Sequence, residues 1–126
     1  MTIAVVAVLL LLGSRQPPPG YPALYHQLQL PEMPGAVVAR AGRQATSLAD
    51  GIRIDIETKE DVGSTLKFFR DRLSAGGWNE TPSRAKVVLA TIGRVEFTKD
   101  RLTFSAMATR RGETTTVQLN VLERPR

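Results

Sequence analysis

Three consecutive segments in the last third of the chain alternate apolar and polar residues, and this pattern constrains the fold most. In "RVEFT", "RLTFSAMAT" and "TTTVQLNVL", apolar side chains recur at every second position. The short stretches "KD" and "RRGE" separate them and contain residues typical of turns. Because successive side chains of a strand point to opposite faces, the pattern predicts an antiparallel meander with one apolar and one polar face.

The polar face of this meander bears on the kind of partner the chain can bind. A sheet that binds single-stranded nucleic acid presents aromatic side chains on which the bases stack. The predicted polar face has none, so we do not expect nucleic acid as the partner. The residues expected on this face are Arg94, Glu96, Thr98, Arg101, Thr103, Ser105, Thr116, Gln118 and Asn120.

A fourth strand is predicted from "GIRIDIET", where isoleucines alternate with Arg53, Asp55 and Glu57. The two carboxylates share a face, which raises the alternative of an acid/base pair. Since Arg53 lies beside them on an exposed face, we interpret them as a charge-balanced surface.

Shorter segments complete the predicted sheet. Ala36–Arg40 is a candidate strand, and "AKVVLAT" is either an extra strand or the start of a longer one that Gly93 interrupts. Gly42 and Gly51 are interpreted as markers of turns in the polar stretch between the two earlier strands.

The stretch "TKEDVGSTLKFFRDRLSAGG" predicts one helix, with Thr58 or Asp61 as its N-cap. An apolar stripe at helical spacing would face the sheet, and Gly76 or Gly77 would end the helix. The stripe consists of Val62, Leu66, Phe69 and Leu73. Trp78 follows directly, so we expect it to fold back against the helix as a core residue rather than to form an exposed stacking platform.

The N-terminal part differs in composition from the rest. Residues 2–13 carry no charge, and a 12-residue helix spans about 18 Å, too short to cross a hydrocarbon core of about 30 Å. We therefore expect residues 1–14 to be a signal peptide or membrane anchor, cleaved or retained. The alternative is a first strand or helix of the domain. Residues 15–35 contain six of the eight prolines and are expected to be a tether, with the domain spanning 36–126.

The charge and the chemistry-bearing residues limit the functions to consider. The chain has no cysteine, which excludes disulfides, thiolate metal sites and cysteine nucleophiles. His26 is the only histidine, has no carboxylate or nucleophile near it in sequence, and is expected to be a surface residue of the tether.

Motifs for phosphate binding and for nucleophilic catalysis are missing from the sequence, and no two carboxylates fall at inward positions. We therefore expect a protein that is not an enzyme, with no catalytic residue, cofactor, metal or small-molecule substrate. The net charge of +5 leaves a second hypothesis, a basic module that binds nucleic acid or another polyanion. Its contacts would be surface arginines such as Arg94, Arg101, Arg110 and Arg111.

Three short motifs, "PEMPGA", "LKFFRDRLSAGGW" and "VEFTKDRLTFS", occur in this order at residues 31–36, 66–78 and 95–105, and the similarity they carry covers most of residues 31–122. Together they resemble a group of small bacterial envelope proteins, many of them lipoproteins, whose chains read P-x-Y-P-G-A, F-Y-R-x-x-L-x-x-x-G-W and F-x-K. Met33 and Phe69 occupy positions where that group usually has tyrosine. Ser14 occupies the position after Leu-x-Gly at which the lipoproteins of that group have a lipidated cysteine. The resemblance implies an extracytoplasmic envelope location without lipid attachment, and it implies no activity or catalytic residue.

These observations predict an α+β domain in which one helix packs on a mostly antiparallel sheet of about five strands. We expect an exported or membrane-anchored envelope protein that acts as a non-enzymatic binding or structural module. Its expected partner is a protein or another envelope component.

Overall fold

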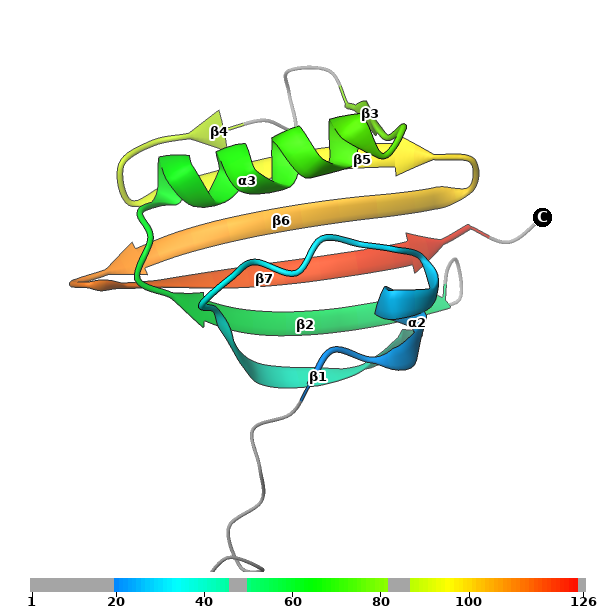
Figure 1. The fold of residues 1–126 in the computed structure, drawn as a ribbon, viewed down its shortest axis with the longest axis horizontal. Coiled ribbons are helices and arrows are strands. Elements are labelled where there is room, and N and C mark those ends of the chain that lie inside the picture. The colour runs from blue at the N-terminus through cyan, green and yellow to red at the C-terminus, as the bar shows by residue number, and fades with distance from the viewer. Residues whose placement is uncertain (1–19, 46–49, 82–86, 125–126) are drawn as a thin grey trace, which may run out of the picture.

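The computed structural model describes residues 20–45, 50–81 and 87–124. Its described part is an antiparallel sheet with one long helix, α3 (Val62–Ala75), and one short helix, α2 (Ala23–Gln27) (Figure 1). The strands lie in the order β1-β2-β7-β6-β5-β3, and β4 also pairs with β5. Their bounds are Val37–Ala45 (β1), Asp50–Thr58 (β2), Asn79–Glu80 (β3), Val87–Val88 (β4), Ile92–Lys99 (β5), Leu102–Arg111 (β6) and Thr114–Glu123 (β7).

The predicted α+β class is therefore confirmed, as is the meander of the last three long strands. β5 pairs with β6, and β6 with β7, in continuous antiparallel register. Asp100 and Gly112 have positive φ angles of 54° and 60°, the left-handed conformation that tight hairpin turns need. Arg101 lies in the first of these turns and not on the polar face of a strand, which corrects its expected position.

The second long strand, β2, pairs with β7, the last strand of the meander, and not with β5, the first. Ile56 lies opposite Val117 in this pairing, and Ile52 opposite Val121. All three isoleucines of β2 are buried, as their alternation predicted. β1 then pairs with the other side of β2 and forms one end of the sheet.

Helix α3 begins and ends where its sequence predicts. Asp61 is the N-cap, and its side chain accepts a hydrogen bond of 2.7 Å from the backbone N–H of Ser64. The stripe from Val62 to Leu73 is buried and packs toward β5 and β6. At the other end, Gly77 has a φ of +86°, and the N–H of Trp78 donates to the carbonyl of Leu73 at 3.0 Å. Gly77 thus supplies the left-handed residue of a Schellman-type helix end.

Trp78 is a core residue, with 7% of its surface exposed. Its ring lies edge-on to Phe104 of β6 with a centroid separation of 6.2 Å, and Phe104 also contacts Phe69 of α3 at 5.9 Å. The reversal at Gly77 therefore brings the tryptophan back under the end of the helix. The interpretation of Trp78 as an anchor is supported, and an exposed stacking platform is excluded.

The expected tether needs a correction for its second half, because residues after Gly20 pack against the sheet. Tyr25, Leu30 and Met33 are all buried, and Tyr25 lies in α2. The Tyr25 hydroxyl donates to the carbonyl of Pro31, and its ring stacks on that of Tyr21 at 4.6 Å. Burial raises the pKa of the Tyr25 hydroxyl well above its ordinary value. Apolar residues spaced among the prolines thus extend the core beyond the predicted start at Ala36.

The glycines expected in turns lie inside strands instead. Gly42 belongs to β1, which continues past the predicted end at Arg40, and Gly51 belongs to β2. A Cβ atom on Gly51 would overlap the carbonyl oxygen of Val121 in the neighbouring strand. Gly51 is therefore needed for the close approach of β2 and β7, and its sequence signature was misread as a turn.

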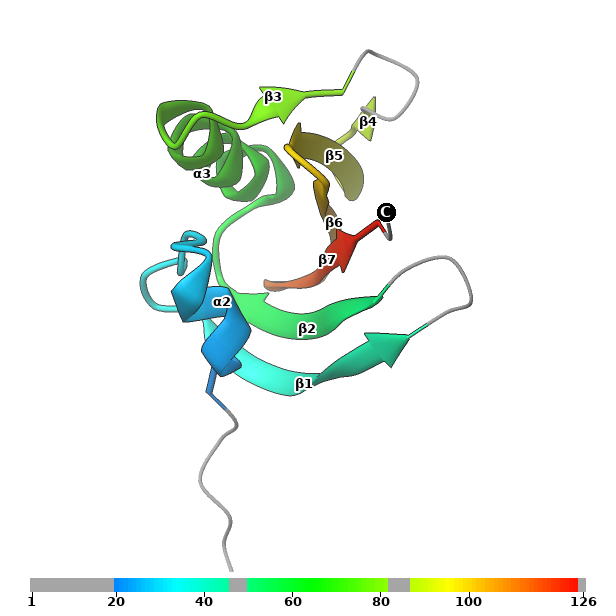
Figure 2. The ribbon, with the colours of Figure 1, turned by 90° about the vertical axis from the view of Figure 1, so that its right-hand side faces the viewer.

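The two helices cover the same face of the sheet, as Figure 2 shows with the sheet seen from its end. We call the opposite face, which carries the polar side chains of the strands, the outer face. Within the described residues no helix is long and apolar enough to cross a membrane. The signal or anchor predicted at residues 1–14 lies outside the described residues.

Candidate binding surface

The outer face is the part of the molecule where polar side chains from several strands come together. Asp55 of β2 lies opposite Gln118 of β7, which in turn lies opposite Met107 of β6. Thr116 and Thr109 form the next pair along β7 and β6. Within the described part of the chain, both helices lie on the other side of the sheet, so these side chains face away from the core.

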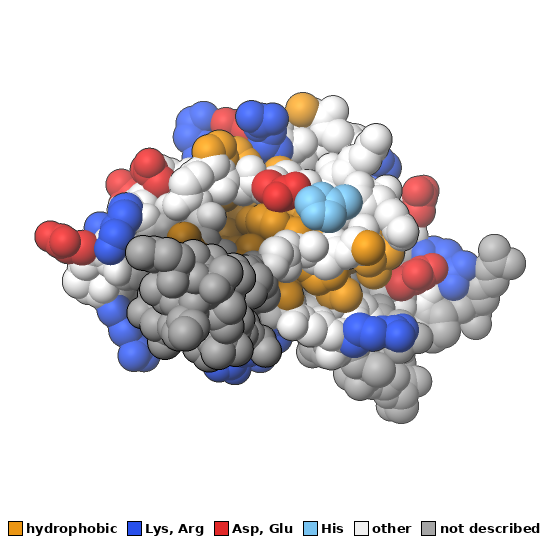
Figure 3. Space-filling view, turned by 60° about the horizontal axis from the view of Figure 1, so that its bottom comes forward, with side chains coloured by type: hydrophobic (Ala, Val, Ile, Leu, Met, Phe, Trp, Pro, Cys, Tyr) orange, Lys and Arg blue, Asp and Glu red, His pale blue; other side chains and the backbone are white. Residues whose placement is uncertain are grey.

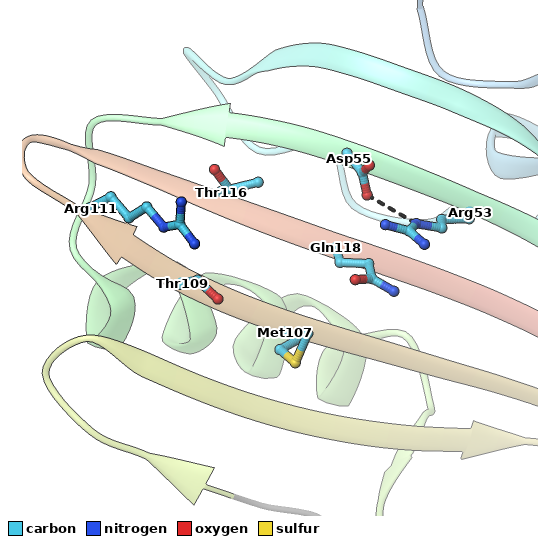
Figure 4. Close-up of a pocket in the computed structure, with 7 residues that line it drawn as sticks. All are labelled: Arg53, Asp55, Met107, Thr109, Arg111, Thr116 and Gln118. Carbon is cyan, nitrogen blue, oxygen red and sulfur yellow. Dashed lines mark hydrogen bonds and ion pairs between the residues drawn. The ribbon is translucent and has the colours of Figure 1, made fainter.

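A hollow of about 330 Å³ lies on this face, and we call it the outer-face hollow. Its lining residues are Arg53, Asp55, Met107, Thr109, Arg111, Thr116 and Gln118. Figure 4 shows the two arginines at opposite ends, with the threonine and glutamine side chains between them. Its volume is near the lower end of the range of about 300–1,000 Å³ that is common for small-ligand pockets.

The two arginines of this hollow differ in their electrostatic surroundings. The Nε of Arg53 donates to Asp55 Oδ1 at 3.2 Å, which balances the charge at that end. Among the described residues, no hydrogen bond or ion pair involves the Arg111 side chain, which is exposed at the end of β6. Its guanidinium is therefore available to a carboxylate or phosphate group, which it can bind through two parallel hydrogen bonds.

The four arginines of the polyanion hypothesis are not brought together. Arg101 donates to the carbonyl of Arg124 through two nitrogens, at 2.9 and 3.3 Å. Arg110 points to the helix side of the sheet, and Arg94 also has an interaction within the described residues. Of the four, Arg111 alone lines the outer-face hollow.

Arg110 has a structural role at the entrance to α3. Its Nη1 donates to the carbonyls of Lys59 and Glu60, at 3.1 and 2.8 Å, and to the hydroxyl of Thr115 at 3.0 Å. The buried Thr115 hydroxyl donates in turn to the Glu60 carbonyl at 2.6 Å. This network, which we call the Arg110 clasp, ties the connection between β2 and α3 to the hairpin of β6 and β7.

The remaining candidates for acid/base or metal chemistry are surface groups. The ring of His26 lies 3.1 Å from Glu32, and both side chains are about half exposed. His26 is exposed as expected, and the fold of residues 20–35 brings the Glu32 carboxylate to it. Asp55 and Glu57 share the outer face as predicted, and Asp55 is bound to Arg53. Within the described residues, no group of three or more histidine or acidic side chains could hold a metal ion.

Sequence reasoning missed two residues of the outer-face hollow, Met107 and Thr109. Both continue the alternation of Thr103 and Ser105 along β6, so the period-two pattern contained the signal. The position of Arg53 beside β7 had no such signal, because the pairing of β2 with β7 joins segments about 60 residues apart in the chain.

No family model, no curated protein and no solved structure matches this chain.

Proposed function

We propose that this chain is a non-enzymatic binding protein of the cell envelope, exported or held at the membrane by residues 1–14. The apolar run from residue 2 to residue 13 supports this, since it has the length of the apolar region of a secretory signal. Every charged side chain of the protein lies at or after Arg15, so the apolar start is separate from the charged domain.

The binding role rests on one observation: among the described residues no helix covers the outer face, and this face has a hollow. The helix-bearing face of the sheet carries the hydrophobic core, whereas the outer face offers donors and acceptors from β2, β6 and β7 around one hollow. Thr109, Thr116 and Gln118 can hydrogen-bond to a polar partner, and Met107 adds an adaptable apolar contact. We infer that the partner, a protein or another envelope component, docks on this face.

Cell fractionation of the full-length chain with a C-terminal tag, with the intact mass of the recovered species, tests the location. We expect the protein in the membrane or extracytoplasmic fraction, either intact or cleaved near Ser14. The variant Leu10→Arg/Leu11→Arg should shift it to the soluble cytosolic fraction, because charge within the apolar run opposes insertion. The matched variant Leu10→Ala/Leu11→Ala should fractionate as the unmodified chain does. Recovery of the unmodified chain as a full-length cytosolic protein would contradict the proposal.

A second candidate function, binding of a polyanion, is supported by Arg111 in the outer-face hollow. A single-stranded 20-nucleotide DNA is a suitable probe, because phosphate contacts make the affinity fall steeply as salt is raised. On this hypothesis Arg111→Gln weakens binding, whereas Arg72→Gln on the helix side does not. Absence of binding at low salt would rule out the candidate.

A further inference from the structure

One long edge of the sheet is unpaired within the described residues. β1 pairs with β2 on one side only, whereas the opposite edge strand β5 is paired in part by β3 and β4. In an edge strand, every second residue directs its N–H and C=O away from the sheet, where another extended chain can bond to them. The register of β1 is interrupted between Val38 and Arg40 and then continues without a shift to Ala45. Residues 40–45 thus offer a regular segment of about 20 Å at 3.3 Å per residue.

A hollow lies along this edge, and three of its five lining residues are arginines. It has a volume of about 280 Å³ and is lined by Arg40, Ala41, Gly42, Arg43 and Arg53. Arg40 and Arg43 are exposed and, among the described residues, take part in no hydrogen bond or ion pair, whereas Arg53 is bound to Asp55. A Cβ on Gly42 would meet no atom within 4 Å, so the space above it is open to a partner's side chain.

Arg40 and Arg43 lie on opposite faces of the sheet, so each would lie beside a different face of a strand added at this edge. Arg40 lies opposite Asp55 on the outer face, and Arg43 lies opposite the inward-facing Ile52. A strand bonded to β1 would alternate its side chains between the same two faces. An acidic side chain on each face of the added strand would therefore lie beside an arginine. The hydrogen bonds between the two backbones would hold the acidic residues and the arginines in register.

A second copy of this chain fits the edge poorly. If two β1 strands paired antiparallel about a twofold axis at Arg40 or at Arg43, that arginine of one copy would lie directly opposite the same arginine of the other. Like charges placed directly opposite destabilise a strand pair. The arginines thus oppose self-association at an edge that is otherwise open to it.

The chain's own remaining residues do not supply the complementary charge. All 12 acidic residues lie within the described ranges, so residues 1–19, 46–49, 82–86 and 125–126 contain no carboxylate side chain. The carboxylate nearest in register, Asp55, is already bound to Arg53. Residues 1–19, 46–49, 82–86 and 125–126, which lie outside the described ranges, therefore do not provide an acidic side chain as an occupant for the edge.

We propose that residues 40–45 of β1 bind an extended acidic segment of a partner protein by strand addition. The unpaired backbone of β1 favours a polypeptide over a polysaccharide or a nucleic acid, because only a polypeptide continues the ladder of N–H and C=O groups. Arg40 and Arg43 select acidic side chains. The inference goes beyond the proposed function and does not rest on the role of residues 1–14.

The test uses the full-length protein in a nonionic detergent and three blocked octapeptides as probes. The first is the acidic peptide TEVEEVET, the second its lysine counterpart TKVKKVKT, and the third the acidic peptide with alternate backbone nitrogens methylated. We expect the acidic peptide to bind at least tenfold more tightly than the other two, and to slow hydrogen exchange of the β1 amides. Equal binding of all three peptides would overturn the proposal, and so would protection confined to the outer-face hollow or no binding at millimolar peptide.

Charge reversal supplies the decisive comparison. The variant Arg40→Glu/Arg43→Glu should lose at least tenfold in affinity for the acidic peptide and gain affinity for the lysine peptide. The control Lys67→Glu/Arg72→Glu makes the same charge change on exposed residues of α3 and should leave the preference unaltered. An unaltered preference in the β1 variant would show that these arginines do not select the partner.

An independent measurement addresses the edge without any peptide. On this inference, Arg40→Thr/Arg43→Thr removes the repulsion between β1 strands, and the variant forms dimers at concentrations where the unmodified protein is monomeric. Sedimentation velocity in the same detergent reports the two states. A dimer of the unmodified protein with protected β1 amides would contradict the proposal, because a second copy would then occupy the edge.

Discussion

Replacement of Trp78 by alanine should remove a large part of the stability of the domain. The side chain is 7% exposed and lies edge-on to Phe104, at the point where the chain leaves α3. A buried tryptophan removes about 150–250 Å² from water, which at about 25 cal/mol per Å² amounts to about 4–6 kcal/mol. Alanine retains a small part of this, so we expect a loss of about 3–5 kcal/mol.

Urea unfolding of the full-length chain in a nonionic detergent, followed by far-ultraviolet circular dichroism, measures this loss. Trp78→Phe keeps an aromatic ring beside Phe104 and should lose clearly less stability than the alanine variant. Leu89→Ala is a suitable control, because Leu89 is 60% exposed and its truncation should change the free energy of unfolding by less than about 0.5 kcal/mol. A Trp78→Ala variant whose free energy of unfolding lies within about 1 kcal/mol of that of the unmodified protein would show that burial of this ring does not hold the helix end on the sheet.

Three further perturbations test other parts of the fold by the same unfolding assay. Thr115→Val removes the buried hydroxyl of the Arg110 clasp and should lower the free energy of unfolding by about 1–3 kcal/mol. Thr114→Val, at the end of the hairpin, should lower it by less. Equal losses in the two variants would show that the clasp does not stabilise the fold. Gly51→Ala should destabilise the pairing of β2 with β7, because its Cβ would overlap the Val121 carbonyl. Gly42→Ala should not destabilise the fold, because a Cβ there meets nothing within 4 Å. A larger loss of stability in Gly42→Ala than in Gly51→Ala would contradict the close approach of β2 and β7. The hydrogen bonds from Ser64 lower the pKa of the Asp61 carboxyl below its ordinary value of 3.8, so its ionisation stabilises the fold above that pH, and this contribution is lost as the pH falls through the lowered folded-state pKa. Asp61→Asn keeps a cap but cannot titrate, so the difference in stability between the two proteins should shrink at low pH, and a difference independent of pH would argue against the charge effect.

The elements with a strong local pattern were predictable from the sequence. The apolar stripe from Val62 to Leu73, with Asp61 before it and Gly77 after it, contains both the helix and its ends. The period-two alternation of β2, β5, β6 and β7 likewise contains their inward and outward faces. Such patterns reflect burial of one face, which acts on every residue of the element.

The parts that were missed depend on contacts between distant segments. Tyr25, Leu30 and Met33 are separated by polar residues and prolines, so no period identified them as core residues. Gly51 resembles a turn residue in sequence, and only the neighbouring Val121 carbonyl explains why a side chain is not accommodated there. The outer-face hollow also depends on a contact between distant segments, because it forms only where β2 lies beside β7.

The helix-bearing face and the outer face also differ in what they offer a partner. Figure 3 shows part of the helix-bearing side, where apolar side chains lie in a depression bordered by polar ones. One hollow near α2 is lined by Leu24, Leu28 and Leu102, together with Arg43. Its volume is about 220 Å³, smaller than that of the outer-face hollow, and it lacks the row of hydroxyl and amide groups found there.

Site-specific photo-crosslinking in cells can detect a partner that docks on the outer face of an envelope protein. One variant carries the photoreactive residue at Thr116 on the outer face, and its control carries it at Ser74, which is exposed on α3. We expect a discrete crosslinked product from position 116 but not from position 74, recovered in the membrane or extracytoplasmic fraction. Crosslinking from position 74 alone, equal crosslinking from both positions, or no product from position 116 would contradict docking on the outer face.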